Sequence, residues 1–219
     1  MNERAPTVTR FTQMLDATLR PLIDPPLARV AGVAIRLGMT ANAATIVGFL
    51  IGLGGAAFIA EEAYLWAIPC ILVSRIFDGL DGAIARRTQA TDVGAFLDIS
   101  LDFIFYAAVV FGFALARPDN ALPAAFLLFT FSGTASTFLG FAIFAARRGI
   151  ATDVRGRKSL YYLGGLTEGT ETIAAFLLAC VFPEAFPWIA TVFGALCLVT
   201  TGTRIATAWQ ILVKGSLDK

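Results

Sequence analysis

Four aspartates between residues 78 and 102 are the side chains of this sequence best placed to do chemistry. Asp78 and Asp81 stand three residues apart, and Asp98 and Asp102 stand four apart, so each pair shares one face of a helix. Carboxylate oxygens suit Mg²⁺, Mn²⁺ and Ca²⁺. The chain has no histidine, which excludes a histidine-ligated metal and a serine–histidine–aspartate triad. The spacing therefore predicts a site for one or two divalent cations.

Small residues continue both acidic faces. Gly82 and Ala85 extend the face of the first pair, and Gly94 precedes Asp98 by four residues on the face of the second. Glycine lets a bulky ligand approach the backbone, and two metal ions held close together suit phosphoryl chemistry. We therefore expect two helices, joined by a short loop, to present four carboxylates to each other beside space for a ligand.

The charge of this cluster can be interpreted in more than one way. A carboxylate at the centre of a membrane helix costs about 2.5–3.5 kcal/mol. The nearby cations are Arg75, Arg86 and Arg87, fewer than the acids, and divalent ions would offset the charge directly. The alternatives are water-exposed aspartates at helix ends, the ion site of a cation transporter, and an inactive membrane scaffold.

The composition indicates a membrane protein. Hydrophobic residues are 57% of the chain and charged residues 15%, whereas soluble domains carry about 25% charged residues. The net charge of +1 argues against a nucleic-acid partner. Cys70, Cys180 and Cys197 lie far apart in apolar stretches, so we expect buried thiols rather than a disulfide framework or a zinc site.

Six apolar runs predict an all-α fold with six transmembrane helices, each needing about 20 residues. The runs cover residues 42–60, 63–81, 94–116, 121–145, 166–184 and 187–212. The second and fifth are the least uniform, because the second carries Arg75 and the fifth carries Glu168 and Glu171. We expect residues 39–219 to form one membrane-embedded catalytic domain.

Residues 1–38 are expected to form an N-terminal segment on the cytoplasmic membrane surface. Apolar residues recur at helical spacing over residues 8–22 with charged residues between them, which is typical of an amphipathic surface helix. Pro25 and Pro26 are predicted to end this helix, and a second short amphipathic stretch follows over residues 27–37.

Loop charges orient the six helices. Basic residues gather in the N-terminal segment, at residues 86–87, at residues 147–158 and in the C-terminal tail, while Arg117 stands among acidic residues on the opposite side. The positive-inside rule then places both termini and the aspartates at the cytoplasmic side, as in a bacterial inner membrane.

The pattern D-x-x-D-G-x-x-A-R…G-x-x-x-D-x-x-x-D, which runs from Asp78 to Asp102, resembles the signature of the CDP-alcohol phosphatidyltransferase family. Thr40-Ala41-Asn42 is similar to the Thr-Pro-Asn that precedes the first span in that family, with Ala41 replacing proline. The loop between Arg86 and Gly94 is one residue shorter than the family spacing. The resemblance covers about residues 36–212 and is most specific over residues 78–102.

The resemblance implies an enzyme of phospholipid biosynthesis. It would transfer a phosphatidyl-type group from a CDP-linked lipid, such as CDP-diacylglycerol, to the hydroxyl of a small polar or lipid alcohol, with release of CMP. It also implies Mg²⁺ or Mn²⁺ as cofactor, with two ions bound, and a homodimer. By position, Asp78, Asp81 and Asp98 would bind the metals, and Asp102 would be the general base and could also touch a metal. The CDP moiety would lie against Asn42, Gly82, Ala85, Arg86 and Gly94.

The acceptor alcohol is less well defined. The basic residues between 147 and 158 favour a phosphorylated acceptor, for which we predict glycerol 3-phosphate, with Arg155 and Lys158 as candidate phosphate ligands. The alternative is that this basic loop only orients the membrane helices. The resemblance also leaves inositol phosphate, serine, choline and phosphatidylglycerol open as acceptors. Helix capping is the alternative role for Asn42. Glu168 and Glu171 are expected to pair with Arg75 or Arg204, with a place facing the acceptor pocket as the alternative, and Arg204 would pair with a carboxylate or bind a lipid phosphate.

Overall fold

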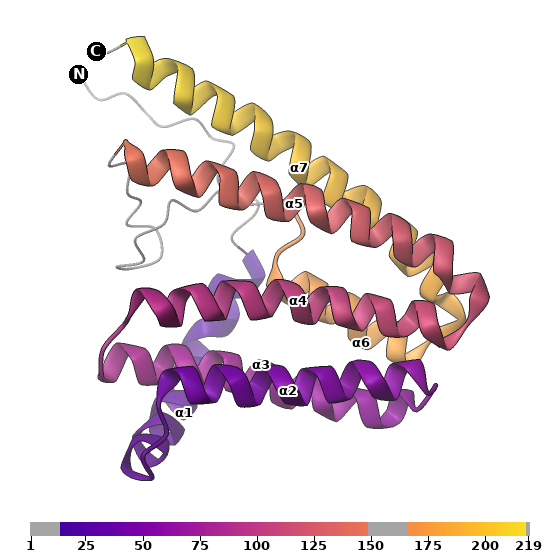
Figure 1. The fold of residues 1–219 in the computed structure, drawn as a ribbon, viewed down its shortest axis with the longest axis horizontal. Helices are drawn as coiled ribbons and strands as arrows, with labels where there is room; N and C mark the ends of the chain where they lie inside the picture. Colours follow the sequence, from indigo (N-terminus) through magenta and orange to yellow (C-terminus); the bar gives the residue numbers. More distant parts are fainter. Residues whose placement is uncertain (1–13, 149–165, 218–219) are drawn as a thin grey trace.

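The computed structural model describes residues 14–148 and 166–217, and these residues form helices joined by short turns (Figure 1). The helix at the N-terminal end is α1 (Met14–Arg36). The apolar runs form α2 (Ala41–Ala60), α3 (Tyr64–Arg87), α4 (Asp92–Ala116), α5 (Ala121–Arg147), α6 (Gly169–Val181) and α7 (Phe186–Leu217). Two 3₁₀ turns, η2 (Pro118–Asn120) and η4 (Pro183–Ala185), precede α5 and α7. The prediction of an all-α fold is confirmed for the described residues.

Polar side chains begin three of these helices. Thr40 caps α2 by accepting a hydrogen bond from the Ala43 amide at 3.2 Å, and Thr91 caps α4 through the Gly94 amide at 3.0 Å. Glu168 and Glu171 form a capping box at the start of α6. These caps supply partners for amides that the first helical turn leaves free, so they fix where each helix begins.

The helix α1 corrects one prediction, because it continues through Pro25 and Pro26 to Arg36 as a single element. A proline inside a helix removes one backbone hydrogen bond and normally kinks or ends the helix. Here the residues after the proline pair are held by packing against α2 and α3. Ala31 and Ala34 are buried in a cluster with Ala44, Leu80, Ala83 and Ile84. The part of the predicted amphipathic stretch before residue 14 lies outside the described residues.

The first membrane helices pack closely because glycines line α2. Helix α2 contacts both α3 and α4, which run beside it in Figure 1. A Cβ atom at Gly48 would lie 2.6 Å from Cβ of Phe77, and one at Gly52 would lie 2.6 Å from Cδ2 of Phe105. On α4, a Cβ at Gly112 would lie 2.6 Å from the Ala56 carbonyl oxygen. The three helices therefore form one tightly packed unit.

The helices α5 and α7 form a second unit that contacts the first through α4. They run side by side and diverge from α4 toward the end where the described chain starts and finishes (Figure 1). The main apolar core lies toward the opposite end, where Phe105, Phe113, Phe176 and Phe186 are buried together. The helices therefore pack together at one end of the bundle, which we call the closed end. At the other end, which holds the aspartates, α5 and α7 separate from α4.

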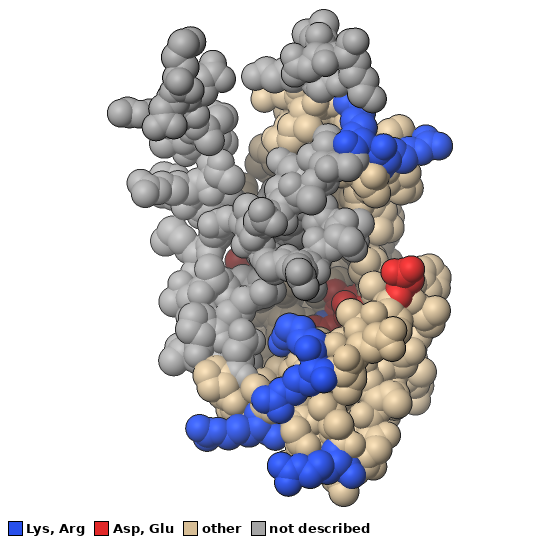
Figure 2. All heavy atoms as spheres, turned by 90° about the vertical axis from the view of Figure 1, so that its left-hand side faces the viewer, with Lys and Arg blue, Asp and Glu red and all other residues tan. Residues whose placement is uncertain are grey.

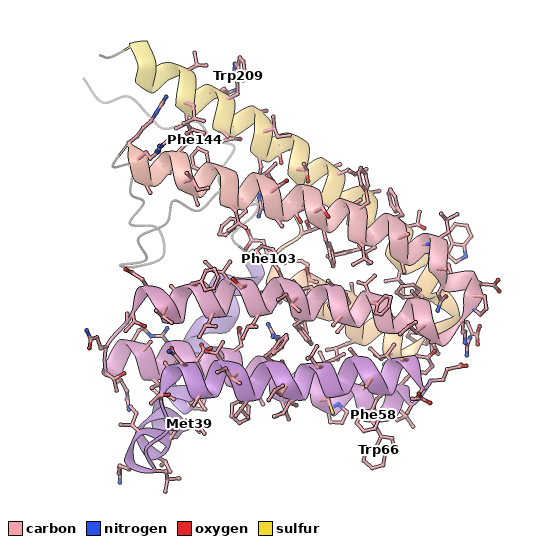
Figure 3. The ribbon with its side chains drawn as sticks, in the orientation of Figure 1. Met39, Phe58, Trp66, Phe103, Phe144 and Trp209 are labelled. Atoms are coloured by element: carbon pink, nitrogen blue, oxygen red, sulfur yellow. The ribbon has the colours of Figure 1, made fainter. Side chains whose placement is uncertain are left out.

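Large apolar side chains also cover the outside of the bundle. Trp66 and Trp209 stand out from the bundle (Figure 3) and are 68% and 71% exposed, and Phe58 and Phe144 are exposed as well. Four described stretches are long and apolar enough to cross a membrane, and they are Ala41–Ala60, Asp92–Ala116, Pro118–Arg147 and Pro183–Val213. An apolar exterior of this extent is typical of contact with lipid rather than water.

Two of the six predicted spans do not have this character. Helix α3 is 24 residues long but carries Arg75, Asp78, Asp81 and two terminal arginines. Helix α6 has 13 residues and therefore rises about 20 Å, whereas a bilayer core is about 30 Å thick. The run predicted over residues 166–184 is therefore not one continuous helix. The α-helix begins only at Gly169, and the 3₁₀ turn η4 follows it from Pro183.

An ion-pair cluster joins three turns at the closed end. The Arg117 guanidinium lies 2.7 Å from Glu62 and 2.5 Å from Glu184, which follow α2 and α6. Hydrogen bonds to Glu184 and Glu62 raise the pKa of Arg117 above its ordinary value. This cluster connects the turns at the ends of α2, α4 and α6.

Candidate active site

All four aspartates lie where the end of α3 meets the beginning of α4. Asp78 and Asp81 are on the last three turns of α3, and Asp98 and Asp102 are on the first three turns of α4. Together they line one small cavity of about 10 Å³. The prediction that the two pairs belong to neighbouring helices facing each other agrees with this arrangement.

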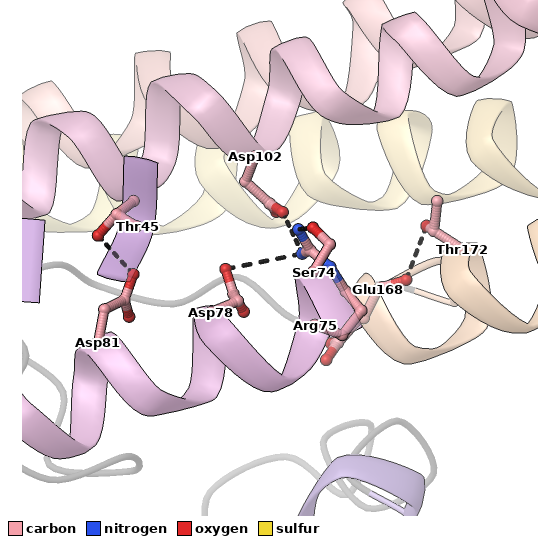
Figure 4. A network of polar contacts seen from close by, with 8 residues as sticks. All are labelled: Thr45, Ser74, Arg75, Asp78, Asp81, Asp102, Glu168 and Thr172. Atoms are coloured by element: carbon pink, nitrogen blue, oxygen red, sulfur yellow. Dashed lines mark hydrogen bonds and ion pairs between the residues drawn. The ribbon is translucent and has the colours of Figure 1, made fainter. Parts of the chain in front are cut away.

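Asp81 is the most buried of the four, at 5% exposure. Its Oδ2 atom accepts a hydrogen bond of 2.6 Å from the Thr45 hydroxyl, which belongs to α2 (Figure 4). A buried carboxylate needs such a partner, because an unpaired polar group away from water is costly. Helix α2 therefore contributes a residue to the site that no sequence pattern indicates, since a lone threonine in an apolar helix carries no signal.

Arg75 is the cation of the site. Its Nη1 atom lies 2.5 Å from Oδ1 of Asp102 and 3.6 Å from Oδ1 of Asp78 (Figure 4). The guanidinium carbon also lies 4.4 Å from the centroid of the Phe105 ring. Arg75 thus pairs with the aspartates of the signature rather than with Glu168 or Glu171, which cap α6. That expected pairing of Arg75 is corrected by the structure.

The donor set has the chemistry that Mg²⁺ or Mn²⁺ requires, because it consists of carboxylate oxygens around one cavity. Among the side chains that the structure describes, however, no three acidic, cysteine or histidine groups converge on one point as they stand. The hydrogen bond from Thr45 holds Asp81, and the ion pair with Arg75 holds Asp102. Joint ligation of a metal therefore requires these carboxylates to turn from their present partners.

A much larger cavity of about 580 Å³ adjoins the aspartates. Asp78, Asp98 and Asp102 line it on one side, and α5, α7 and the start of α6 line it on the others. The wall alternates aromatic residues with hydroxyl groups. Its members include Phe103, Tyr106, Phe131, Ser132, Thr134, Phe138, Thr167, Glu168, Thr170 and Arg204. The aspartates therefore stand between a small polar cavity and a space large enough for a substrate.

Arg204 brings a second positive charge to this large cavity. It is 7% exposed, and its Nη1 atom donates a hydrogen bond of 3.1 Å to the Thr134 carbonyl oxygen on α5. Its guanidinium carbon lies 5.8 Å from the centroid of the Phe138 ring. A nearly buried arginine beside a cavity is suited to recognising an anionic group.

The residues predicted to contact the CDP moiety lie near the same helix ends. A Cβ atom at Gly94 would lie 3.0 Å from Oδ1 of Asn42, so the start of α2 approaches the start of α4. A Cβ atom at Gly82 would lie 3.2 Å from Nη1 of Arg86. Asn42 does not cap α2, because Thr40 has that role. Gly82 and Arg86 are thus neighbours on α3, where Ala85 is half-buried, while Asn42 and Gly94 approach each other at the starts of α2 and α4. A common nucleotide site for these residues stays a prediction.

Basic side chains lie beside a recess at the aspartate end of the molecule. Figure 2 shows acidic atoms inside a recess and Lys or Arg side chains beside it. Arg86 and Arg87 end α3, and Arg147 ends α5. Arg155 and Lys158, the predicted ligands of an acceptor phosphate, lie outside the described residues.

Comparison with known proteins adds independent evidence. Residues 38–203 match the sequence model of the CDP-alcohol phosphatidyltransferases. The chain is 52% identical to the inner membrane protein YnjF of Escherichia coli over 200 residues, which are 91% of this chain and 97% of the relative. It is 29% identical to the phosphatidylinositol phosphate synthase of Mycobacterium marinum over 201 residues, 85% of this chain and 80% of the relative.

The fold is similar to that of a solved enzyme. The phosphatidylinositol phosphate synthase of Mycobacterium tuberculosis, crystallised with CDP-DAG bound, superposes with a TM-score of 0.62 at 25% identity. The match covers 84% of this chain and 93% of that enzyme. Likeness over most of both chains extends the similarity from the short aspartate pattern to the whole helical bundle.

Proposed function

Since this chain belongs to the CDP-alcohol phosphatidyltransferase family, we propose that it transfers a phosphatidyl-type group from a CDP-linked lipid to the hydroxyl of an acceptor alcohol and releases CMP. Family membership favours an enzyme of phospholipid biosynthesis over a cation transporter or an inactive scaffold. The observation that carries the proposal is the position of the aspartates, which line a small polar cavity and open onto a substrate-sized one.

The reaction is proposed to depend on Mg²⁺ or Mn²⁺, with two ions bound. Asp78, Asp81 and Asp98 would hold them, because these carboxylates face one cavity from two helices. When bound, such ions neutralise a diphosphate and polarise its phosphorus–oxygen bonds. Without them, four carboxylates would repel the diphosphate of the donor.

Asp102 is proposed as the general base. Like Asp78 and Asp98, it lines both cavities, and the family resemblance gives this role to the last aspartate of the pattern. Its carboxylate would take the proton of the acceptor hydroxyl while that oxygen attacks the phosphorus of the lipid-side phosphate. No histidine is available for this role, and a base must stand within hydrogen-bond reach of the proton that it removes.

The nucleotide of the donor is proposed to lie at the junction of α2, α3 and α4. The helix surface there is formed by backbone and small side chains at Asn42, Gly82, Ala85 and Gly94. Arg86 adds a positive charge beside Gly82. Small residues permit a close approach of the nucleotide to the helices. The acyl chains would then extend along the apolar outside of the bundle or into lipid.

The acceptor is proposed to be a phosphorylated alcohol in the large cavity. Arg204 offers a guanidinium for its phosphate, and the hydroxyl groups of the wall offer partners for its own hydroxyls. Glycerol 3-phosphate is the acceptor that we predict from the sequence. The name of the Mycobacterium marinum relative, phosphatidylinositol phosphate synthase, favours an inositol phosphate as the second acceptor to test.

In the membrane, we propose six spans with both termini and the active site at the cytoplasmic side. Helices α3 and α6 would complete the bundle beside the four apolar stretches, shielded in part by contact with each other. The arginines at the ends of α3 and α5 lie at the aspartate end. Helix α1 would lie on the membrane surface, and a homodimer is expected from the family resemblance.

The proposal is tested by measuring CMP release from purified protein in detergent. The assay contains CDP-diacylglycerol and Mg²⁺ or Mn²⁺, with glycerol 3-phosphate, inositol phosphate or an unphosphorylated alcohol in separate reactions. We expect CMP with one of the phosphorylated acceptors, and loss of that signal with EDTA. CMP release with an unphosphorylated alcohol only would contradict the proposed acceptor class. An undiminished rate in EDTA would contradict the metal dependence.

A further inference from the structure

Arg75 is fixed in place more firmly than a surface arginine would be. Its guanidinium lies on the Phe105 ring, at 4.4 Å from the centroid, and its Nη2 atom donates to the Ser74 hydroxyl at 3.3 Å. Both Phe105 and Ser74 are fully buried. Contact with an aromatic face stabilises a partly desolvated guanidinium, in addition to the ion pair with Asp102.

A glycine on α2 makes room for this arrangement. A Cβ atom at Gly52 would lie 2.6 Å from Cδ2 of Phe105 and 2.9 Å from Oγ of Ser74. Phe105 and Ser74, which contact Arg75, therefore occupy the space that a larger side chain at position 52 would need. The position of Arg75 thus depends on the packing of α2, α3 and α4 and not on a single ion pair.

Arg75 holds Asp102 more closely than it holds Asp78. Its Nη1 atom is 2.5 Å from Asp102 and 3.6 Å from Asp78, whereas Asp81 has the Thr45 hydroxyl as its partner. An Asp102 oxygen that accepts a charged hydrogen bond has less electron density to offer to a metal ion. A guanidinium close to the site also repels a divalent cation.

We propose that Arg75 is a positioning residue of this active site, a resident cation that holds the Asp102 carboxylate and keeps it from joining the other aspartates around a divalent ion. This inference rests on the proposed metal-dependent transfer. It assigns Asp102 to the acceptor side and leaves the metals to Asp78, Asp81 and Asp98. Loss of Arg75 should therefore strengthen metal binding while it weakens catalysis, a combination that general damage to the fold would not produce.

The test compares Arg75→Gln with the unaltered protein in two measurements. Binding of Mn²⁺ to protein without donor, followed by electron paramagnetic resonance, should become about tenfold tighter, since changing a residue that hydrogen-bonds a carboxylate beside a metal site alters metal affinity by about 10- to 100-fold. In the CMP assay, kcat should fall by about tenfold or more, while KM for the donor stays within about twofold. Adding Asp102→Asn to Arg75→Gln should remove most of the gain in Mn²⁺ affinity.

The matched control is Arg117→Gln at the closed end. Arg117 also forms two short ion pairs with carboxylates, but it lies in the turn after α4, far along the helix from Asp102. Its loss should change neither Mn²⁺ affinity nor kcat. Unchanged or weaker Mn²⁺ binding by Arg75→Gln would overturn the inference.

A second variant covers the case in which Arg75→Gln is not recovered as folded protein. Arg75→Lys keeps the charge but loses the planar fork, so kcat should fall while Mn²⁺ affinity stays within about twofold. Normal kcat in this variant would overturn the inference. If the unaltered protein neither binds Mn²⁺ nor releases CMP, the proposed function fails, and that outcome is distinct from failure of the role of Arg75.

Discussion

Asp98 and Asp92 belong to the same helix but have different surroundings. Asp98 lines both cavities of the site, whereas Asp92 is exposed in the first turn of α4. We predict that Asp98→Asn lowers CMP release by about 100-fold or more, because a proposed metal ligand loses its charge. Asp92→Asn, the matched control, should leave the rate within about twofold, since it only alters the charge at an exposed helix end. Equal losses in both variants would point to helix stability instead of metal binding.

Arg204 offers a separate prediction about the acceptor. Arg204→Gln should raise KM for a phosphorylated acceptor by about tenfold or more and change kcat less, because a charged hydrogen bond to the acceptor is lost. Initial rates at varied acceptor concentration measure this effect. Arg36→Gln, at the exposed end of α1, is the control and should leave KM unchanged. A normal KM in Arg204→Gln would contradict a role for Arg204 in binding the acceptor and would leave it a structural role, such as its hydrogen bond to Thr134 on α5.

Residue types and spacing predicted that the four aspartates belong to one site, but they did not predict which side chains pair with them. Carboxylates three and four apart within apolar runs are visible in any reading of the chain, because helical periodicity is local. The ion pair between Arg75 and Asp102 joins residues 27 positions apart. It depends on how α3 and α4 are rotated against each other, which local periodicity does not contain. The same holds for Thr45 and Asp81, which are 36 positions apart.

At the scale of the elements, the length of each apolar run predicted that a helix would form there. The predicted and observed helix ends differ where tertiary packing or a helix cap sets the boundary. Proline residues 25 and 26 predicted a helix end, yet α1 continues because its later residues are buried against α3. The fifth run, predicted over residues 166–184, holds an α-helix of 13 residues, because the capping box of Glu168 and Glu171 starts α6 at Gly169, a local signal that apolar length alone does not contain. Caps and prolines are local signals whose effect depends on the tertiary contacts around them.

Two glycines of α2 allow a test of helix packing. Gly52→Ala should lower the apparent melting temperature and reduce the free energy of unfolding by about 1–3 kcal/mol, because the new methyl group would overlap Phe105 and Ser74. Gly54→Ala meets no heavy atom within 4 Å, and it should be neutral or slightly stabilising, since alanine favours helix over glycine. Thermal unfolding in detergent measures both. Equal stability in the two variants would contradict the close packing of α2 on α4.

At the scale of the whole molecule, charge is separated between the two ends of the bundle. The aspartate end carries Arg86, Arg87 and Arg147 on helix termini. At the closed end, Arg117 is surrounded by Glu62 and Glu184, which offset its charge. Because positively charged loops are retained in the cytoplasm, the aspartates and the CDP-linked lipid would meet at the cytoplasmic surface, where a water-soluble acceptor can enter the large cavity.

This orientation is tested by labelling introduced cysteines in intact cells. The native residues Cys70, Cys180 and Cys197 are first replaced, and a single cysteine is placed at Asp119 or at Thr88. Asp119 lies in η2 at the closed end, so a membrane-impermeant maleimide should label it from outside. Thr88 follows α3 at the aspartate end and should react only after the membrane is opened. The reverse pattern would place the active site outside, where a phosphorylated acceptor from the cytoplasm could not reach Asp102, and would contradict the proposed acceptor supply as well as the topology.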